Sequence, residues 1–257
     1  MPIALKIRIK QLSAVELGIV NFASPKMVGF RLQKGFPMKK PYIFFDFDGT
    51  VLNSNNIIVE SWKVVAKHYF GEERSTEYWE KTFGEPISYT ASVAFPGVDL
   101  EEAVAFYRKW QADHVDNNLD LFDGIYELLS ELKARGYKLA IVTSRMRPTT
   151  YEYLDRFGIR DFFDVIIDHN STTAHKPDPE PLLLAVSEMA KATGKEIKLS
   201  ECIMLGDTRF DMLCCKNAGI DSVLIGWSHA IDEDQLKELG ALPVYRIAEP
   251  MDLLEIV

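Results

Sequence analysis

From residue 39 onward, short apolar runs alternate with segments in which apolar residues recur at helical spacing. The apolar runs predict buried strands at 42–46, 138–143, 164–168, 202–206 and 222–226. The segments between them predict helices, each followed by a glycine, over about 124–135, 149–157, 180–193 and 210–218. Repeated βα units of this kind predict an α/β fold: a doubly wound, Rossmann-like parallel sheet with helices on both faces.

The alternation of strands and helices is interrupted between residues 55 and 122. Helical spacing is clearest over 57–70 and 100–115, and no run in this segment is convincing as a strand. We therefore expect a small helical cap over 55–122, inserted into an α/β core formed by 39–54 and 123–257. Ligands of such sheets bind at the carboxyl ends of the strands, so a moving cap would open and close a site there.

The charge of the chain is unevenly distributed along its length. The formal net charge is −9, and residues 1–40 carry +7, so the remainder carries −16. Residues 1–38 are expected to be an extension outside the core: a disordered or poorly attached segment, a targeting segment, a nucleic-acid or membrane arm, or the product of an over-long translation start with Met38 as the true one. The acidic remainder repels nucleic acid, so we expect no nucleic-acid partner. If the protein binds phosphate, it needs a few focused cations and a metal.

The composition indicates a packed protein of a reducing compartment. Hydrophobic residues make up 47% of the chain and charged residues 26%, which is sufficient for a core. No run of about 18 uncharged apolar residues appears, so a membrane span is excluded. Cys202, Cys214 and Cys215 cannot form a disulfide framework, and no CxxC or HExxH zinc motif is present. We expect a soluble cytoplasmic protein, either a monomer or a homodimer, with no membrane partner.

Two carboxylates stand at the end of the first predicted strand. Asp46 and Asp48 are spaced i, i+2, so their side chains project to the same side of an extended chain. Their mutual repulsion is offset most naturally by a divalent cation. Gly49 allows the chain to turn sharply after them. The competing interpretation is an ordinary Asx turn that closes the strand.

Polar groups also follow three other predicted strands. They are the hydroxyls of Thr143 and Ser144, the amine of Lys176 in a loop stiffened by two prolines, and the carboxylates of Asp207 and Asp211. Taken singly, these are equally typical of a helix N-cap, a solvated loop lysine and an acidic first helical turn. Four strand ends of one parallel sheet carry them, in the order acid pair, hydroxyls, lysine, acid pair. That joint placement favours one phosphate-binding and metal-binding site.

The four motifs together resemble a known family. Asp46-Phe-Asp-Gly-Thr-Val, Thr143-Ser, Lys176-Pro-Asp-Pro and Gly206-Asp-Thr-Arg-Phe-Asp are similar to the motifs of the haloacid dehalogenase-like hydrolase superfamily, in its phosphatase branch. The resemblance covers about residues 39–257. The predicted cap helices resemble the small cap of the phosphoglycolate phosphatase group. Phe83-Gly-Glu-Pro-Ile and the residues after Lys176 are similar to that group and to the related PpaX-type pyrophosphatases.

The resemblance implies a chemical role for each motif. Asp46 would be the nucleophile that forms an aspartyl-phosphate, and Asp48 the general acid and then the base. Lys176 would neutralise the charge that develops between the phosphoryl group and Asp46, and Thr143 would hold a phosphoryl oxygen. Dehalogenases of the superfamily lack the second aspartate, so Asp48 favours phosphate chemistry.

The resemblance also implies a Mg²⁺ site and a substrate site. Mg²⁺ would bind to Asp46, the backbone carbonyl of Asp48 and Asp207, with Asp211 acting through water or as a support. The substrate would contact Thr143, Ser144, Arg145 and Lys176, and Arg147 is a further candidate. His169 and His229, which show no ligand spacing, are predicted to be structural.

We therefore predict a Mg²⁺-dependent phosphatase that hydrolyses a small soluble phosphomonoester, similar to phosphoglycolate, or pyrophosphate. One alternative is a phosphomutase resembling β-phosphoglucomutase, which uses the same aspartates. A second is a non-catalytic phosphate-binding module that has kept the fold. A binding module has no need of the Asp48 acid, so the intact carboxylate set favours an enzyme.

Overall fold

The computed structural model describes residues 39–115, 119–229, 231 and 233–257. The extension predicted over residues 1–38 therefore lies outside the described part of the chain. The described residues belong to one compact unit, Met38–Val257.

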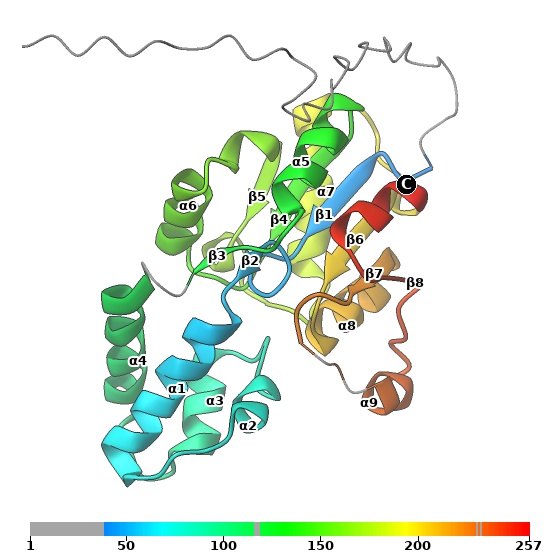
Figure 1. Cartoon of the computed structure of the whole chain (residues 1–257). Helices are drawn as coiled ribbons and strands as arrows, with labels where there is room; N and C mark the ends of the chain where they lie inside the picture. Colours follow the sequence, from blue (N-terminus) through cyan, green and yellow to red (C-terminus); the bar gives the residue numbers. More distant parts are fainter. Residues whose placement is uncertain (1–38, 116–118, 230, 232) are drawn as a thin grey trace, which may run out of the picture. The chain divides into compact units, whose positions relative to one another are not determined.

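A six-stranded parallel sheet forms the centre of this unit (Figure 1). Its order is β5-β4-β1-β6-β7-β8, and every neighbouring pair is parallel. The strands are β1 (Tyr42–Phe45), β4 (Lys138–Val142), β5 (Val165–Ile167), β6 (Cys202–Gly206), β7 (Asp221–Ile225) and β8 (Tyr245–Ile247). The predicted α/β fold is confirmed. The edge strand β8 was not predicted, because only Ile247 of its three residues is buried.

Alternate residues of the central strand explain why helices cover both faces of the sheet. Ile43 and Phe45 point into a core cluster shared with α5, α6 and the 3₁₀ helix η5. Tyr42 and Phe44 point the other way, into a cluster shared with α7 and α8. A parallel strand buried on both faces is apolar throughout, as this one is. The bounds of the helices are α5 (Ile125–Ala134), α6 (Arg147–Arg156), α7 (Glu180–Thr193), α8 (Arg209–Ala218), α9 (Glu233–Glu238), η2 (Arg160–Phe162), η3 (His169–Ser171), η4 (Leu199–Glu201) and η5 (Pro250–Glu255).

Four helices are inserted into the chain after β1, and Figure 1 shows them grouped together. They are α1 (Asn55–Phe70), α2 (Thr76–Glu80), α3 (Ile87–Ala94) and α4 (Leu100–His114). The insertion has an aromatic core of its own, in which the ring of Trp62 lies 5.8 Å from Trp79, 5.8 Å from Phe95 and 4.2 Å from Tyr107. A helical group with its own core can move as a unit.

A short ribbon joins the insertion to the sheet-forming part. β2 (Leu52–Asn53) enters the insertion and β3 (Asp120–Leu121) leaves it, and the two pair antiparallel. The sequence analysis expected no strand between 55 and 122, so β3 corrects it. A strand of two residues is too short to show a hydrophobic period.

The three cysteines of the chain, Cys202, Cys214 and Cys215, are all buried and free. Burial raises the pKa of the Cys214 thiol to about 12, which suppresses formation of its thiolate.

Within the described residues, no helix has both the length and the apolar content needed to cross a bilayer.

Candidate active site

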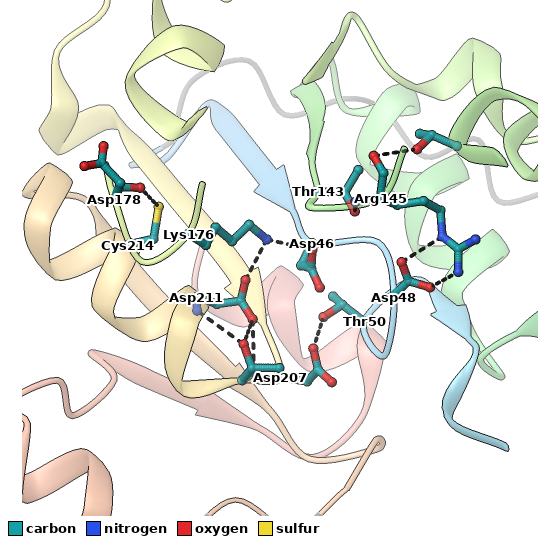
Figure 2. Close-up of polar contacts among 12 residues, drawn as sticks. Asp46, Asp48, Thr50, Thr143, Arg145, Lys176, Asp178, Asp207, Asp211 and Cys214 are labelled. Atoms are coloured by element: carbon teal, nitrogen blue, oxygen red, sulfur yellow. Dashed lines mark hydrogen bonds and ion pairs between the residues drawn. The ribbon is translucent and has the colours of Figure 1, made fainter. Parts of the chain in front are cut away.

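The predicted site residues meet at the carboxyl ends of neighbouring strands (Figure 2). Asp46, Thr143 and Asp207 each come directly after the last residue of a strand, namely β1, β4 and β6. Lys176 lies in the loop between β5 and α7. Because these strands are parallel neighbours, their carboxyl ends share one edge of the sheet. All four residues line a cavity of about 610 Å³ between this edge and the helical insertion.

Three buried carboxylates form the acidic part of the site. Asp46, Asp207 and Asp211 each offer an oxygen, and these oxygens lie within 4.8 Å of one another. Oxygen ligands at such spacing suit a hard divalent cation. Gly49 has φ +75°, and a Cβ added there would lie 2.0 Å from Oδ2 of Asp207. The glycine therefore allows the turn after β1 to approach this carboxylate closely.

Lys176 is the cation that the structure places among these acids. Its Nζ donates to Oδ1 of Asp46 at 2.6 Å and to Oδ1 of Asp211 at 2.7 Å. Although burial opposes the charge of the ammonium, these carboxylates raise the pKa of Lys176. Burial raises the pKa of Asp46 well above its usual range despite Lys176, and Asp211 and Asp207 add to the effect. A divalent cation bound by these acids would favour the ionised form of Asp46.

Asp48 is held in a bidentate ion pair with Arg145. Nε of Arg145 donates to Oδ2 of Asp48 at 2.8 Å, and Nη2 donates to Oδ1 at 2.6 Å. Burial opposes the charge of this carboxylate, but Arg145 holds the pKa of Asp48 below its ordinary value. The guanidinium also lies over the ring of Tyr153 at 4.9 Å. The ion pair with Arg145 therefore favours the ionised form of Asp48.

The residues of the Thr143-Ser motif and the two arginines that follow it do not all face the cavity. Thr143, Ser144 and Arg145 line the cavity, and Oγ1 of Thr143 accepts a hydrogen bond from the backbone N–H of Arg145. Arg147 does not line it, because its Nε donates to the buried Asp168 at 2.7 Å. The structure thus brings together every site residue of the four motifs and leaves Arg147 outside.

Comparison with known proteins identifies the family. The family model described as haloacid dehalogenase-like hydrolase matches residues 43–225. The chain belongs to the haloacid dehalogenase-like hydrolases. It is accordingly a hydrolase of phosphoric ester or anhydride bonds, and a phosphatase of this family.

Several relatives share most of the chain. Pyrophosphatase PpaX of Halalkalibacterium halodurans is 35% identical over 218 residues, which cover 84% of this chain and 95% of that protein. Pyrophosphatase PpaX of Bacillus velezensis is 33% identical over 189 residues, or 72% of this chain and 83% of the relative. The crystal structure of a Lactobacillus plantarum protein, provisionally named a phosphoglycolate phosphatase, has a TM-score of 0.74 at 25% identity. That alignment covers 86% of this chain and all of the other.

In this haloacid dehalogenase-like hydrolase, three neighbours of Asp207 were missed from the sequence. Oγ1 of Thr50 donates to Oδ1 of Asp207 at 3.2 Å, and Oγ of Ser228 donates to Oδ2 at 3.1 Å. Nδ1 of His229 lies 3.3 Å from the same Oδ2, although the sequence analysis predicted His229 to be structural. The available signal was position: Ser228 and His229 follow β7, the neighbour of β6, and so reach the same edge of the sheet.

A loop of the helical insertion is fastened to the beginning of α8. Nη2 of Arg209 donates to Oε1 of Glu85 at 2.6 Å, and Nη1 donates to the carbonyl oxygen of Lys81 at 3.3 Å. A Cβ on Gly84 would lie 2.7 Å from the ring of Phe210, so only glycine fits there. The Phe83 ring meets that of His229 edge-on at 4.9 Å. These contacts hold the insertion against the residues that surround Asp207.

Arg209→Gln should loosen this loop without unfolding the protein. The Glu85 carboxylate is largely buried, so losing its charged partner should cost about 1–3 kcal/mol. Backbone amides of residues 81–86 should then exchange hydrogen faster, which mass spectrometry can follow. The exchanged pair Arg209→Glu with Glu85→Arg should slow that exchange again. Unchanged exchange in Arg209→Gln would show that the ion pair does not fasten the loop.

Proposed function

We propose that this protein is a Mg²⁺-dependent phosphatase that hydrolyses pyrophosphate through an aspartyl-phosphate intermediate on Asp46. The observation that carries the proposal is the convergence of Asp46, Lys176, Asp207 and Asp211 at one strand-end site. The name of the PpaX relatives favours pyrophosphate as the substrate. A small phosphomonoester similar to phosphoglycolate is the second candidate, favoured by the Lactobacillus plantarum structure.

Asp46 and Asp48 supply the covalent chemistry in this proposal. A carboxylate oxygen of Asp46 attacks phosphorus, and the bond from phosphorus to the leaving oxygen breaks. Asp48 gives a proton to that leaving oxygen. In the second step a water molecule attacks the aspartyl-phosphate and gives its proton to Asp48, and the bond between phosphorus and Asp46 breaks. Asp48 must exchange its contact with Arg145 for a proton before it can act as the acid.

The other residues of the site neutralise the charge of the phosphoryl group and hold it in position. Lys176 already contacts Asp46 and can neutralise the phosphoryl group placed beside it. Thr143 and Ser144 line the cavity and offer hydroxyl and backbone N–H donors to phosphoryl oxygens. Asp46, Asp207 and Asp211, with the Asp48 backbone carbonyl, would hold Mg²⁺, and their buried oxygen set fits this ion. When bound, Mg²⁺ would neutralise and orient phosphoryl oxygens.

The test is phosphate release from a defined set of compounds. With MgCl₂ present, pyrophosphate should give the highest kcat/KM, followed by phosphoglycolate, and esters whose leaving group carries no anionic group, such as phenyl phosphate, should give a lower value. A preference for phosphoglycolate would move the assignment to the second candidate. If a sugar bisphosphate transferred its phosphoryl group to a sugar phosphate without releasing phosphate, the protein would be a mutase. No turnover of any compound would overturn the proposal.

A further inference from the structure

One cation in the wall of the cavity forms no ion pair with an acid in the part of the chain that the structure describes. The lysines and arginines that line the cavity are Lys176, Arg145 and Arg108. Lys176 is paired with Asp46 and Asp211, and Arg145 is paired with Asp48. Arg108, on α4 of the helical insertion, is exposed, and no carboxylate of the described residues lies within ion-pair distance of it. Its charge therefore remains available to a ligand.

Two histidines line the same cavity and lie against each other. The rings of His169, which begins η3, and His175, which precedes Lys176, are stacked with centroids 3.9 Å apart. Burial lowers the pKa of His169, and the charges of His175 and Arg108 lower it further, although the charge of Asp168 opposes the shift. Arg108 and His175 therefore lie close enough to His169 for a positive charge on either to repel a protonated His169 ring. A negative charge placed among them would relieve that repulsion.

The carboxylates near the histidines are engaged elsewhere. Asp168 is bound by Arg147, and Glu180 accepts hydrogen bonds from the backbone N–H groups of Thr173 and Ala174. The remaining acid of this wall, Glu152 on α6, is exposed. Asp168 still acts on His169 through its charge and Glu180 on His175, but no carboxylate of the described residues forms an ion pair with Arg108, His169 or His175. The cluster of these three residues thus has donors for an anion that are not taken up by an ion pair.

We propose that Arg108, His169 and His175 form a second anion site, which binds the negatively charged leaving group of the substrate. The inference rests on the proposed function and narrows the class of substrate. The substrate class is a phosphate compound with a second anionic group, either a phosphoryl group as in pyrophosphate or a carboxylate as in phosphoglycolate. Asp46 and Lys176 line the same cavity, so one small substrate can contact both sites. The site also draws on both the insertion and the sheet-forming part, so an anion bound there would hold the two together.

The kinetic test compares Arg108→Gln with Lys109→Gln. Lys109 is the next residue on α4, is paired with Asp113 at the surface and does not line the cavity. Arg108→Gln should lower kcat/KM about tenfold or more for pyrophosphate and for phosphoglycolate, since a charge-assisted contact is lost. Phenyl phosphate, whose leaving group has no second charge, should change less than about twofold. Lys109→Gln should match the wild type on all three compounds.

A binding measurement tests the second anion site without requiring that the protein turn over a substrate. In protein carrying Asp46→Asn, pyrophosphate and inorganic phosphate are titrated by calorimetry with and without Arg108→Gln or His169→Gln. Each added variant should weaken pyrophosphate binding about tenfold and leave phosphate binding within about twofold. If only pyrophosphate or only phosphoglycolate is affected in the kinetics, that compound identifies the anion recognised.

The outcomes separate the two proposals. An equal loss for compounds with and without a second anionic group, or no loss, overturns the second anion site and leaves the proposed phosphatase activity intact. If the wild type turns over none of the compounds, the proposed function fails. The binding result then decides whether the cluster still recognises a second anion.

Discussion

Asp46→Asn is expected to reduce phosphate release to below about 1% of wild type, because losing a covalent step costs several kcal/mol. An amide is of similar size but is a poor nucleophile. It retains an oxygen that can accept the hydrogen bond from Lys176, and Asp211 remains the second partner of that lysine. The folded state should therefore survive the substitution while the chemistry does not.

The measurement is phosphate release at saturating MgCl₂, together with the thermal midpoint of each protein. Asp155→Asn is a matched control, because Asp155 is an exposed carboxylate paired with Arg160 outside the cavity. It should leave the turnover unchanged. Residual activity of Asp46→Asn well above about 1%, with contamination excluded, would contradict the nucleophile role.

The strands and helices of the sheet-forming part were predictable because their sequences repeat one simple pattern. β6 and α7 have the bounds expected from the sequence, and β1 differs by one residue at its end. β2, β3 and β8 could not be found in this way. β2 and β3 have only two residues each, and a run of that length carries no period. β8 has three residues, as β5 does, but only Ile247 of them is buried, so no apolar run marks it. The pairing of β2 with β3 depends on where the long insertion places its two ends.

The composition of the site was predictable, but the pairing of its residues was not. Parallel strands place Asp46, Thr143 and Asp207 at one edge whatever their side chains do. The ion pair of Asp48 with Arg145 joins residues 97 positions apart, and nothing local in either segment specifies it. Arg145 and Arg147 both follow the Thr143-Ser motif, and the sequence does not indicate which of them faces the cavity. In the structure Arg145 lines the cavity, whereas Arg147 binds Asp168. That choice follows from the position of β5 beside β4, which brings Asp168 to Arg147.

Mg²⁺ should raise the thermal midpoint of this protein, and Asp207→Asn should largely remove that increase. A ligand that binds only the folded state at a hundred times its Kd stabilises it by about 2.7 kcal/mol. In a protein of this size that corresponds to roughly 5–10 °C. Burial raises the pKa of Asp207 even though His229 opposes the shift, and a bound cation would favour the ionised form of this carboxyl group. An amide at this position offers one neutral oxygen in place of a carboxylate.

Asp211→Asn should behave differently from Asp207→Asn, because Asp211 has a second task. Its Oδ1 accepts from Lys176, and its Oδ2 accepts from the backbone N–H and hydroxyl of Thr208 at the N-terminus of α8. Breaking a buried ion pair costs about 3–5 kcal/mol, so Asp211→Asn should lower the midpoint before any metal is added. Asp207 is bound by hydroxyls and a histidine, so its substitution should mainly affect the metal.

The experiment records thermal midpoints and phosphate release in chelator and across a range of MgCl₂ at constant ionic strength. Wild type should be inactive in EDTA and should regain activity with Mg²⁺. Asp207→Asn should need at least about tenfold more Mg²⁺ for half-maximal activity, the effect of losing a charged ligand. NaCl at matched ionic strength should restore no activity. Full activity in EDTA, or an undiminished Mg²⁺-dependent increase of the midpoint in Asp207→Asn, would show that these carboxylates do not hold the metal.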